Sequence, residues 1–261
     1  IRKKALGLTE YNTYDRFLPL AKNSKKYPYN EAKQLFLEAI KDFPQEFVHN
    51  QVEALKDGYV DAAPQDGKRT GAYSSSFYGH HPFILLNHND TLDSVFTLAH
   101  EAGHSAHSIF SDTAQPMPIS DYTIFVAEIA STFNEHALLD YLLKKADSKE
   151  EKIELLTMSI DNIMGTFYRQ TLFATYEYEA NKLVQEGNPI NDKNLSKIMI
   201  DLYQHYYGLD ISKEPGKQYV WAYIPHLFNT PFYVYQYATS FSASLKIYEN
   251  VKIIPFMDDL I

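Results

Sequence analysis

The sequence contains no cysteine, which excludes disulfide bonds and any metal site built from thiolates. It also lacks a long apolar run: no stretch approaches the ~18 residues of a membrane-spanning helix, and no signal-peptide core follows the basic residues at the start. Basic residues are outnumbered, and the net charge of −9 argues against nucleic acids and anionic membranes as partners. We therefore expect a cytoplasmic protein.

The rest of the composition is that of a folded domain rich in helices. The 261 residues, 45% of them hydrophobic, suffice for one large core. Apolar residues recur at helical spacing over most of the chain, for example along residues 150–186, a pattern that ends at Gly187-Asn188-Pro189. Only residues 71–87 have the character of strands. The sequence thus predicts a mainly α fold with a small β-sheet.

One short motif carries more chemical information than any other part of the chain. His100, Glu101 and His104 form the pattern H-E-x-x-H, in a helix predicted to start at Asn89-Asp90-Thr91. With 3.6 residues per turn, positions i and i+4 share one helix face, so both imidazoles can reach one zinc ion. Glu101 can then act on a water at the metal. The alternative is a helix whose histidines face solvent or satisfy one another's hydrogen bonds.

A catalytic zinc usually has three protein ligands, and the next predicted helix offers a third. Residues 122–135 are mostly apolar with Glu128 near the centre, where a carboxylate buried without a partner would cost several kcal/mol. Thr132 and Glu135, together with Ser131, follow on the same face and are candidates to hydrogen-bond the ligands. Two alternatives remain open: Glu128 could pair with a basic residue, or His107 could be the third ligand.

Several separated segments resemble oligoendopeptidase F, which belongs to the thimet-oligopeptidase-like family of zinc metallopeptidases. The resemblance lies in residues 68–74, 82–87, 90–104, 125–133 and 233–239. It implies a zincin-like catalytic domain of many helices, with the small sheet beside the zinc-binding helix. It also implies a helical segment at residues 1–67 that leads into a catalytic domain at 68–261. Family members are typically longer, so the N-terminal part of the usual family chain is expected to be absent here.

The resemblance also assigns roles to individual residues. It implies one Zn²⁺ per chain, held by His100, His104 and Glu128. It also implies that Glu101 is the general base. A histidine that contacts substrate and tyrosines near the reacting carbonyl are implied at His226, Tyr233 and Tyr237. A neutral hydroxyl donor suits the oxyanion of peptide hydrolysis. Tyr235 is a further candidate for contact with substrate.

The predicted strand at residues 82–87 could pair with an extended peptide. In zinc peptidases a strand at this position resembles the edge strand that holds the substrate, which makes Ile84, Leu85, Leu86 and Asn87 candidate substrate-binding residues. An ordinary core strand is the other interpretation, and the two are compatible.

Together these features predict a zinc metalloendopeptidase that hydrolyses oligopeptides. Two other classes remain open, namely a zinc aminopeptidase and a zinc-stabilised peptide-binding module or inactive fragment. Glu101 favours an enzyme, because a structural zinc site has no use for that carboxylate and is usually closed by four protein ligands. The sequence leaves the oligomeric state open.

Overall fold

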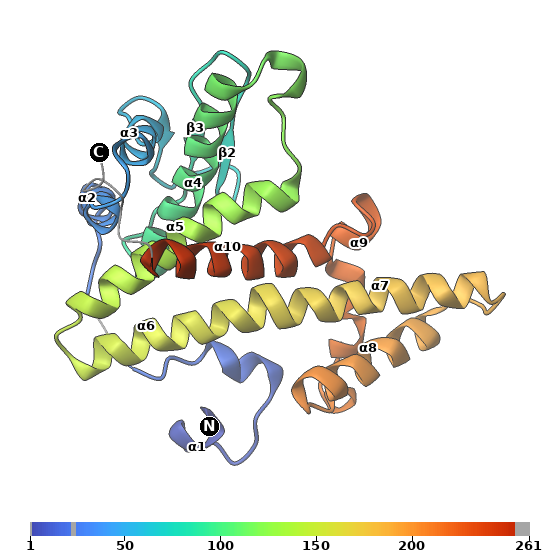
Figure 1. The fold of residues 1–261 in the computed structure, drawn as a ribbon. Helices are drawn as coiled ribbons and strands as arrows, with labels where there is room; N and C mark the ends of the chain where they lie inside the picture. The colour runs from blue at the N-terminus through green and yellow to red at the C-terminus, as the bar shows by residue number, and fades with distance from the viewer. Residues whose placement is uncertain (1, 22–24, 254–261) are drawn as a thin grey trace. The chain divides into compact units, whose positions relative to one another are not determined.

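The computed structural model of the protein describes residues 2–21 and 25–253. These residues form a mainly helical structure with a small three-stranded sheet, which confirms the predicted fold class (Figure 1). The chain divides into two compact units. Unit 1 comprises Ile1–Lys22 and Lys149–Thr239, and unit 2 comprises Asn23–Ser148 and Ser240–Ile261.

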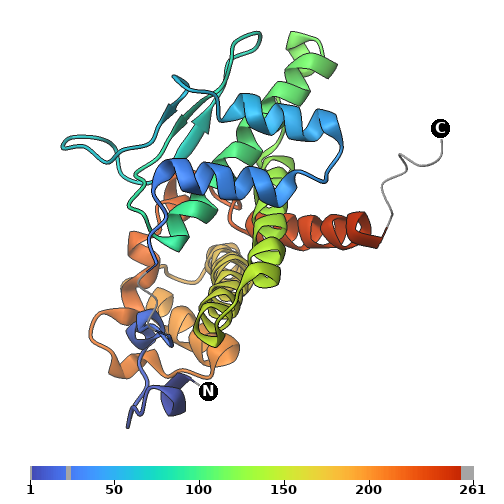
Figure 2. The same ribbon diagram turned by 90° about the vertical axis from the view of Figure 1, so that its left-hand side faces the viewer.

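Unit 2 is built around α4 (Leu92–Ala114), which contains the H-E-x-x-H motif. α4 packs against α5 (Ile124–Lys145), α2 (Tyr29–Ile40) and α3 (Gln45–Ala54), and also against the sheet. Figure 2 shows α2 and α3 as the two blue helices beside the strands. A short helical turn, η2 (Met117–Ile119), lies between α4 and α5 in the chain. The motif is therefore held in a helix that is covered on several sides.

The start of α4 agrees with the sequence prediction and has a clear local cause. The Thr91 hydroxyl accepts a hydrogen bond from the backbone N–H of Ser94 at 3.3 Å, which caps one of the free donors of the first turn. Val95, Leu98 and Ala99 then follow at helical spacing, each with no exposed surface. Their burial fixes which face of α4 points into the core.

The sheet has the strand order β1-β3-β2. β3 (Phe83–Leu85) pairs in parallel with β1 (Val60–Asp61) and antiparallel with β2 (Tyr73–Ser75). The sequence did not predict β1, because two residues are too few to show the alternation that marks a strand.

The expectation that this strand is an edge of the sheet was wrong, whereas contact of residues 84–87 with a substrate stays a prediction. Ile84 and Leu85 belong to the central strand, which is paired on both sides. The Leu86 N–H bonds to the Asp61 carbonyl at 2.8 Å, and the Asn87 amide donates to the carbonyls of residues 69 and 71. β3 is thus a core strand, and the edge strand of the sheet on that side is β2.

Unit 1 contains one long helix with a π-helical middle. α6 (Lys149–Asn162), the π segment η3 (Ile163–Tyr168) and α7 (Arg169–Gln185) follow without a break, which confirms the helix predicted over 150–186. α7 packs against α8 (Asp192–Tyr207) through a buried core. The members of that core include Leu172, Phe173, Met199, Ile211 and Val220.

The remaining elements of unit 1 are short. They are α1 (Arg2–Ala5), η1 (Thr13–Phe17), η4 (Ile211–Lys213), η5 (Lys217–Tyr223) and α9 (His226–Asn229). α10 (Tyr235–Ile253) starts in unit 1 and continues into unit 2.

Across the described residues, none of the helices has both the length and the apolar character that a bilayer crossing requires. The expected division of the sequence between residues 67 and 68 stays a prediction, and residues 254–261 of its second part lie outside the described residues.

Candidate metal centre

A glycine inside the H-E-x-x-H motif sets the distance between the two helices of the site. A Cβ at Gly103 would lie 2.7 Å from the Ala130 carbonyl oxygen and 2.7 Å from the Ser131 Cα, both on the backbone of α5. Only glycine therefore allows the two helices this close, and the close approach brings Glu128 to the motif. Sequence analysis missed this role. The signal was there, since a glycine in a helix costs stability and usually has a packing reason.

Three candidate ligand atoms converge at this helix contact. The Nε2 atoms of His100 and His104 lie 3.2 Å apart. Glu128 Oε2 lies 3.5 Å from the first of these nitrogens and 3.9 Å from the second. Ligands ~2.0–2.2 Å from a tetrahedral zinc stand about 3.3–3.5 Å from one another. Two imidazoles and one carboxylate at these separations therefore fit a zinc ion.

Two of the donors are oriented by neighbours on α5. His100 Nδ1 hydrogen-bonds to Glu135 Oε1 at 2.5 Å, so a proton on Nδ1 leaves the lone pair of Nε2 directed at the metal position. The Ser131 hydroxyl donates to Glu128 Oε2 at 3.1 Å. Thr132 differs from the expectation, because its hydroxyl contacts the backbone carbonyl of Glu128 and the Ser244 hydroxyl rather than a ligand side chain.

The pKa values of the two histidines are shifted in opposite directions. Burial lowers the pKa of His100, but the hydrogen bond and charge of Glu135, with the charges of Glu128 and Glu101, outweigh it and raise the pKa to about 9. Burial, with the neighbouring His100 and His107, lowers the pKa of His104 to about 3. The carboxylates thus concentrate negative charge here, a field that a divalent cation would neutralise.

Glu101 faces the same space as the ligands, and its environment suits proton transfer. Its side chain is 6% exposed, and Oε2 has no hydrogen-bond partner among the described residues. Burial raises the pKa of Glu101 to about 6, with opposing contributions from the His100 charge and a hydrogen bond from the Ser74 backbone. A carboxylate with a free buried oxygen and a pKa near neutrality can take up and release a proton.

These groups line a cleft of about 490 Å³ within unit 2. β2 forms one wall through Tyr73 and Ser74, and Tyr122 adds a phenol between the helices. Figure 1 shows β2 beside α4. The sequence predicted β3 as the strand beside the site. The role of Tyr122 was missed because the sequence predicts it as the first residue of a helix over 122–135, whereas α5 begins at Ile124.

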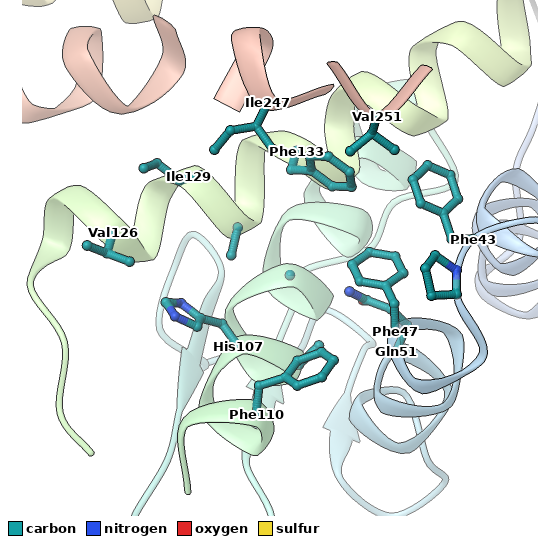
Figure 3. A pocket seen from close by; sticks show the side chains of 14 residues that line it. Phe43, Phe47, Gln51, His107, Phe110, Val126, Ile129, Phe133, Ile247 and Val251 are labelled. Carbon is teal, nitrogen blue, oxygen red and sulfur yellow. The ribbon is translucent and has the colours of Figure 1, made fainter. Parts of the chain in front are cut away.

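His107, the alternative third ligand, lies outside the three-donor group. Its ring stacks on Tyr122 with centroids 3.9 Å apart, and its Nδ1 is buried without a hydrogen-bond partner. It lines an apolar cavity of about 400 Å³, where Figure 3 shows it opposite Phe47 and near Phe110. His107 lies about one helix turn beyond His104, and its side chain is therefore on a neighbouring, apolar side of α4.

The other predicted site residues lie in unit 1. His226 stacks on Tyr233 with centroids 5.5 Å apart and meets Tyr237 edge-on at 6.1 Å. Tyr235 is the first residue of α10 and is 50% exposed. The three aromatic residues therefore form one group, and Tyr235 is not part of it.

A buried glutamate that sequence analysis missed supports this aromatic group. Glu177 Oε1 on α7 accepts the backbone N–H of Phe232 at 2.7 Å, directly before Tyr233. Phe232 has a φ of +59°, a conformation that residues other than glycine seldom adopt. The carboxylate thus holds the turn that carries Tyr233. Its sequence context, an ordinary helix face, gave no sign of this contact.

The comparison with known proteins agrees with the geometry. The model of peptidase family M3 matches residues 1–254. The chain belongs to peptidase family M3. Its similarity to oligopeptidase PepF of Bacillus subtilis is 40% identity over 94% of this chain and 36% of that protein. For the chromosomal oligoendopeptidase F of Lactococcus lactis subsp. cremoris the identity is 39%, over 96% of this chain and 42% of that protein.

Solved structures of similar proteins have the same fold. A structure from Chlamydophila abortus matches with a TM-score of 0.82 and 41% identity, over 97% of this chain and 42% of that one. Oligoendopeptidase-F from Enterococcus faecium matches with a TM-score of 0.68 and 29% identity, over 98% of this chain and 38% of that one. The chain thus spans about two fifths of the length of these relatives, and the resemblance read from the sequence is confirmed.

Proposed function

We propose that this M3 chain is a zinc-dependent endopeptidase that hydrolyses peptide bonds in oligopeptides. The observation that carries the proposal is the meeting of three zinc-type donors with the buried carboxylate of Glu101, whose Oε2 has no hydrogen-bond partner among the described residues, in one cleft of unit 2. A structural zinc site would usually be closed by a fourth protein ligand. Among the described residues, His100, His104 and Glu128 are the whole group of donors that could hold the metal here. A metallopeptidase uses that open position for water and substrate.

The proposed chemistry divides between the metal and Glu101. His100, His104 and Glu128 would hold one zinc ion, which when bound supplies a Lewis acid that polarises the scissile carbonyl and makes water more acidic. Glu101 takes the proton of the attacking water at its free oxygen and passes it to the amine that leaves. The hydrogen bond from the Ser74 backbone holds the Glu101 carboxylate in place during both transfers.

The remaining roles are proposed from the family resemblance together with local structure. His226, Tyr233 and Tyr237 would contact the substrate and donate hydrogen bonds to the developing oxyanion. An extended peptide would lie along β2, the edge strand that lines the cleft, rather than along the central strand β3. Oligopeptides are the proposed substrates and the cytoplasm the proposed location.

The proposal is tested by measuring zinc content and cleavage of an internally quenched peptide together. We expect one zinc per chain in the wild type and in Glu101→Gln, with cleavage reduced by ~10²–10⁴-fold only in the variant. Glu38→Gln, an exposed carboxylate on α2, is the matched control and should behave as the wild type.

Other outcomes contradict the proposal in distinguishable ways. Zinc in both proteins with cleavage in neither would assign the chain to a zinc-stabilised binding module. Cleavage that is lost when the peptide N-terminus is acetylated would assign it to the aminopeptidases. Absence of stoichiometric zinc after resupply would remove the metal from the account.

A further inference from the structure

Unit 1 contains a cavity of about 500 Å³ whose wall is basic. Four cationic residues line it, namely Arg2, Arg16, Arg169 and Lys217, against a single acidic residue, Asp161. The formal charge of the wall is therefore +3, within a chain whose net charge is −9. A concentration of one sign against the overall charge indicates an anion as the ligand.

Three of these cations have no carboxylate partner. Arg2 forms an ion pair with Asp161 at 2.8 Å. For Arg16, Arg169 and Lys217, no carboxylate lies within ion-pair distance in the part of the chain that the structure describes. The unpaired cations therefore leave the cavity with positive charge that no residue of its wall neutralises.

Glu214, an acidic group that acts electrostatically on Lys217, is already engaged. It favours the charged form of Lys217 electrostatically, but its two oxygens accept hydrogen bonds from the Thr13 backbone N–H at 2.8 Å and the Thr13 hydroxyl at 2.6 Å. Its role is to fix the segment at residue 13 beside η5, and it leaves the basic wall open to a ligand.

The electrostatics of the wall reflect this excess of positive charge. Burial, and then the charges of Arg169 and Arg16, lower the pKa of Lys217 despite the opposing effect of Glu214. Burial raises the pKa of Tyr203 to about 12, although the same two arginines pull it down. The phenol therefore stays neutral and offers an O–H donor beside the cations.

Aromatic rings complete the cavity. Lys217 Nζ lies 5.6 Å from the centre of the Tyr203 ring, and Arg169 Nη2 donates to the Tyr223 hydroxyl at 3.4 Å. Tyr14 and Phe17, which also line the cavity, are 62% and 74% exposed. Exposed flat rings in the wall of a basic cavity are suited to stacking on a planar ligand.

We propose that this cavity binds a small phosphate monoester that carries a flat aromatic ring, the chemistry of a mononucleotide. A phosphate monoester brings up to two negative charges and three acceptor oxygens, which match three unpaired cations and neighbouring phenols. A single carboxylate would leave two of the cations unneutralised. The volume lies within the range of small-molecule sites and leaves room for a ring as well as the phosphate.

This site lies within unit 1 and uses none of the residues proposed to bind zinc. Its occupancy is therefore independent of the proposed peptidase activity, and the two proposals can fail separately. Binding should persist after zinc has been removed with a chelator.

The test is a calorimetric titration of the 261-residue chain with AMP, adenosine and inorganic phosphate. We expect one AMP site per chain, with adenosine and phosphate each at least tenfold weaker, because each supplies only half of the contacts. Arg169→Gln and Lys217→Gln should each weaken AMP binding at least tenfold. Lys197→Gln, an exposed lysine of the same unit paired with Asp201, is the control and should bind AMP as the wild type does.

Several results would overturn the proposal. These are no AMP binding at millimolar concentration, equal binding of phosphate and AMP, or unchanged AMP binding in both cavity variants while they keep the wild-type circular dichroism spectrum. Tighter binding of an acidic dipeptide than of AMP would assign the cavity to carboxylate ligands instead. If one variant unfolds, the other variant and the ranking of the three ligands decide.

Discussion

The metal centre of unit 2 and the basic cavity of unit 1 are both charged sites, but their charges are balanced differently. In unit 2 two of the three ligand groups have a partner that orients them, namely Glu135 for His100 and Ser131 for Glu128. In unit 1, Arg16 and Arg169 converge without a carboxylate partner. His100 and Glu128 of the metal site are thus oriented by protein groups alone. The positive charge of the basic cavity, by contrast, would be neutralised only by a ligand.

Removal of a ligand should have the largest effect. His104→Ala removes one of the three converging donors, so zinc affinity should fall by more than the ~10–100-fold that loss of a supporting residue causes. Competition with a chromophoric zinc chelator measures the affinity. An affinity equal to that of the wild type would show that the zinc is held elsewhere.

Removal of a supporting residue should have a smaller effect on the same quantity. Glu135→Gln keeps the size of the side chain but removes the charge that holds His100 Nδ1, so zinc affinity should fall by ~10–100-fold. The same chelator competition applies, with Glu38→Gln as the exposed control. A loss as large as that of His104→Ala would mean that Glu135 is itself a ligand.

The two helical glycines should respond in opposite ways to the same substitution. Gly103→Ala puts a methyl group against the backbone of α5, so the free energy of unfolding should fall by ~1–3 kcal/mol. Gly165→Ala meets no atom within 4 Å and should be neutral or stabilising by up to ~1 kcal/mol. Denaturant unfolding measures both, and equal effects would contradict the close approach of α4 and α5.

The smallest expected effect concerns the unpaired cations without a ligand. Lys217→Gln relieves repulsion from Arg16 and Arg169, so the free energy of unfolding should rise, by no more than ~0.5 kcal/mol at this partly exposed position. Lys197→Gln breaks an exposed ion pair and should leave stability unchanged or slightly lower. A clear loss of stability in Lys217→Gln would show that the cation is satisfied within unit 1.

The two sites also differ in how far the sequence predicted them. His100, Glu101 and His104 lie within five residues of one helix, so their spacing alone placed them on one face. Glu128 was predicted because a lone carboxylate in an apolar helix needs a partner. The central position of β3 was not predicted, because its partner β1 has only two residues and comes from a distant segment.

The basic cavity had no signal in the sequence. Arg16, Arg169 and Lys217 come from segments more than 40 residues apart, and each looks like an ordinary surface residue beside its neighbours. The same holds for Glu177, whose contact with Phe232 spans 55 positions. Local spacing predicts sites within one or two helices, whereas sites assembled from several segments appear only once the fold is known.

The most direct test of the account is a zinc titration that compares Glu128→Gln with His107→Ala. The account predicts one zinc per chain in the wild type, a loss of affinity of more than ~100-fold in Glu128→Gln, and wild-type affinity in His107→Ala. Wild-type affinity in Glu128→Gln with a large loss in His107→Ala would contradict the three-donor centre and make His107 the third ligand.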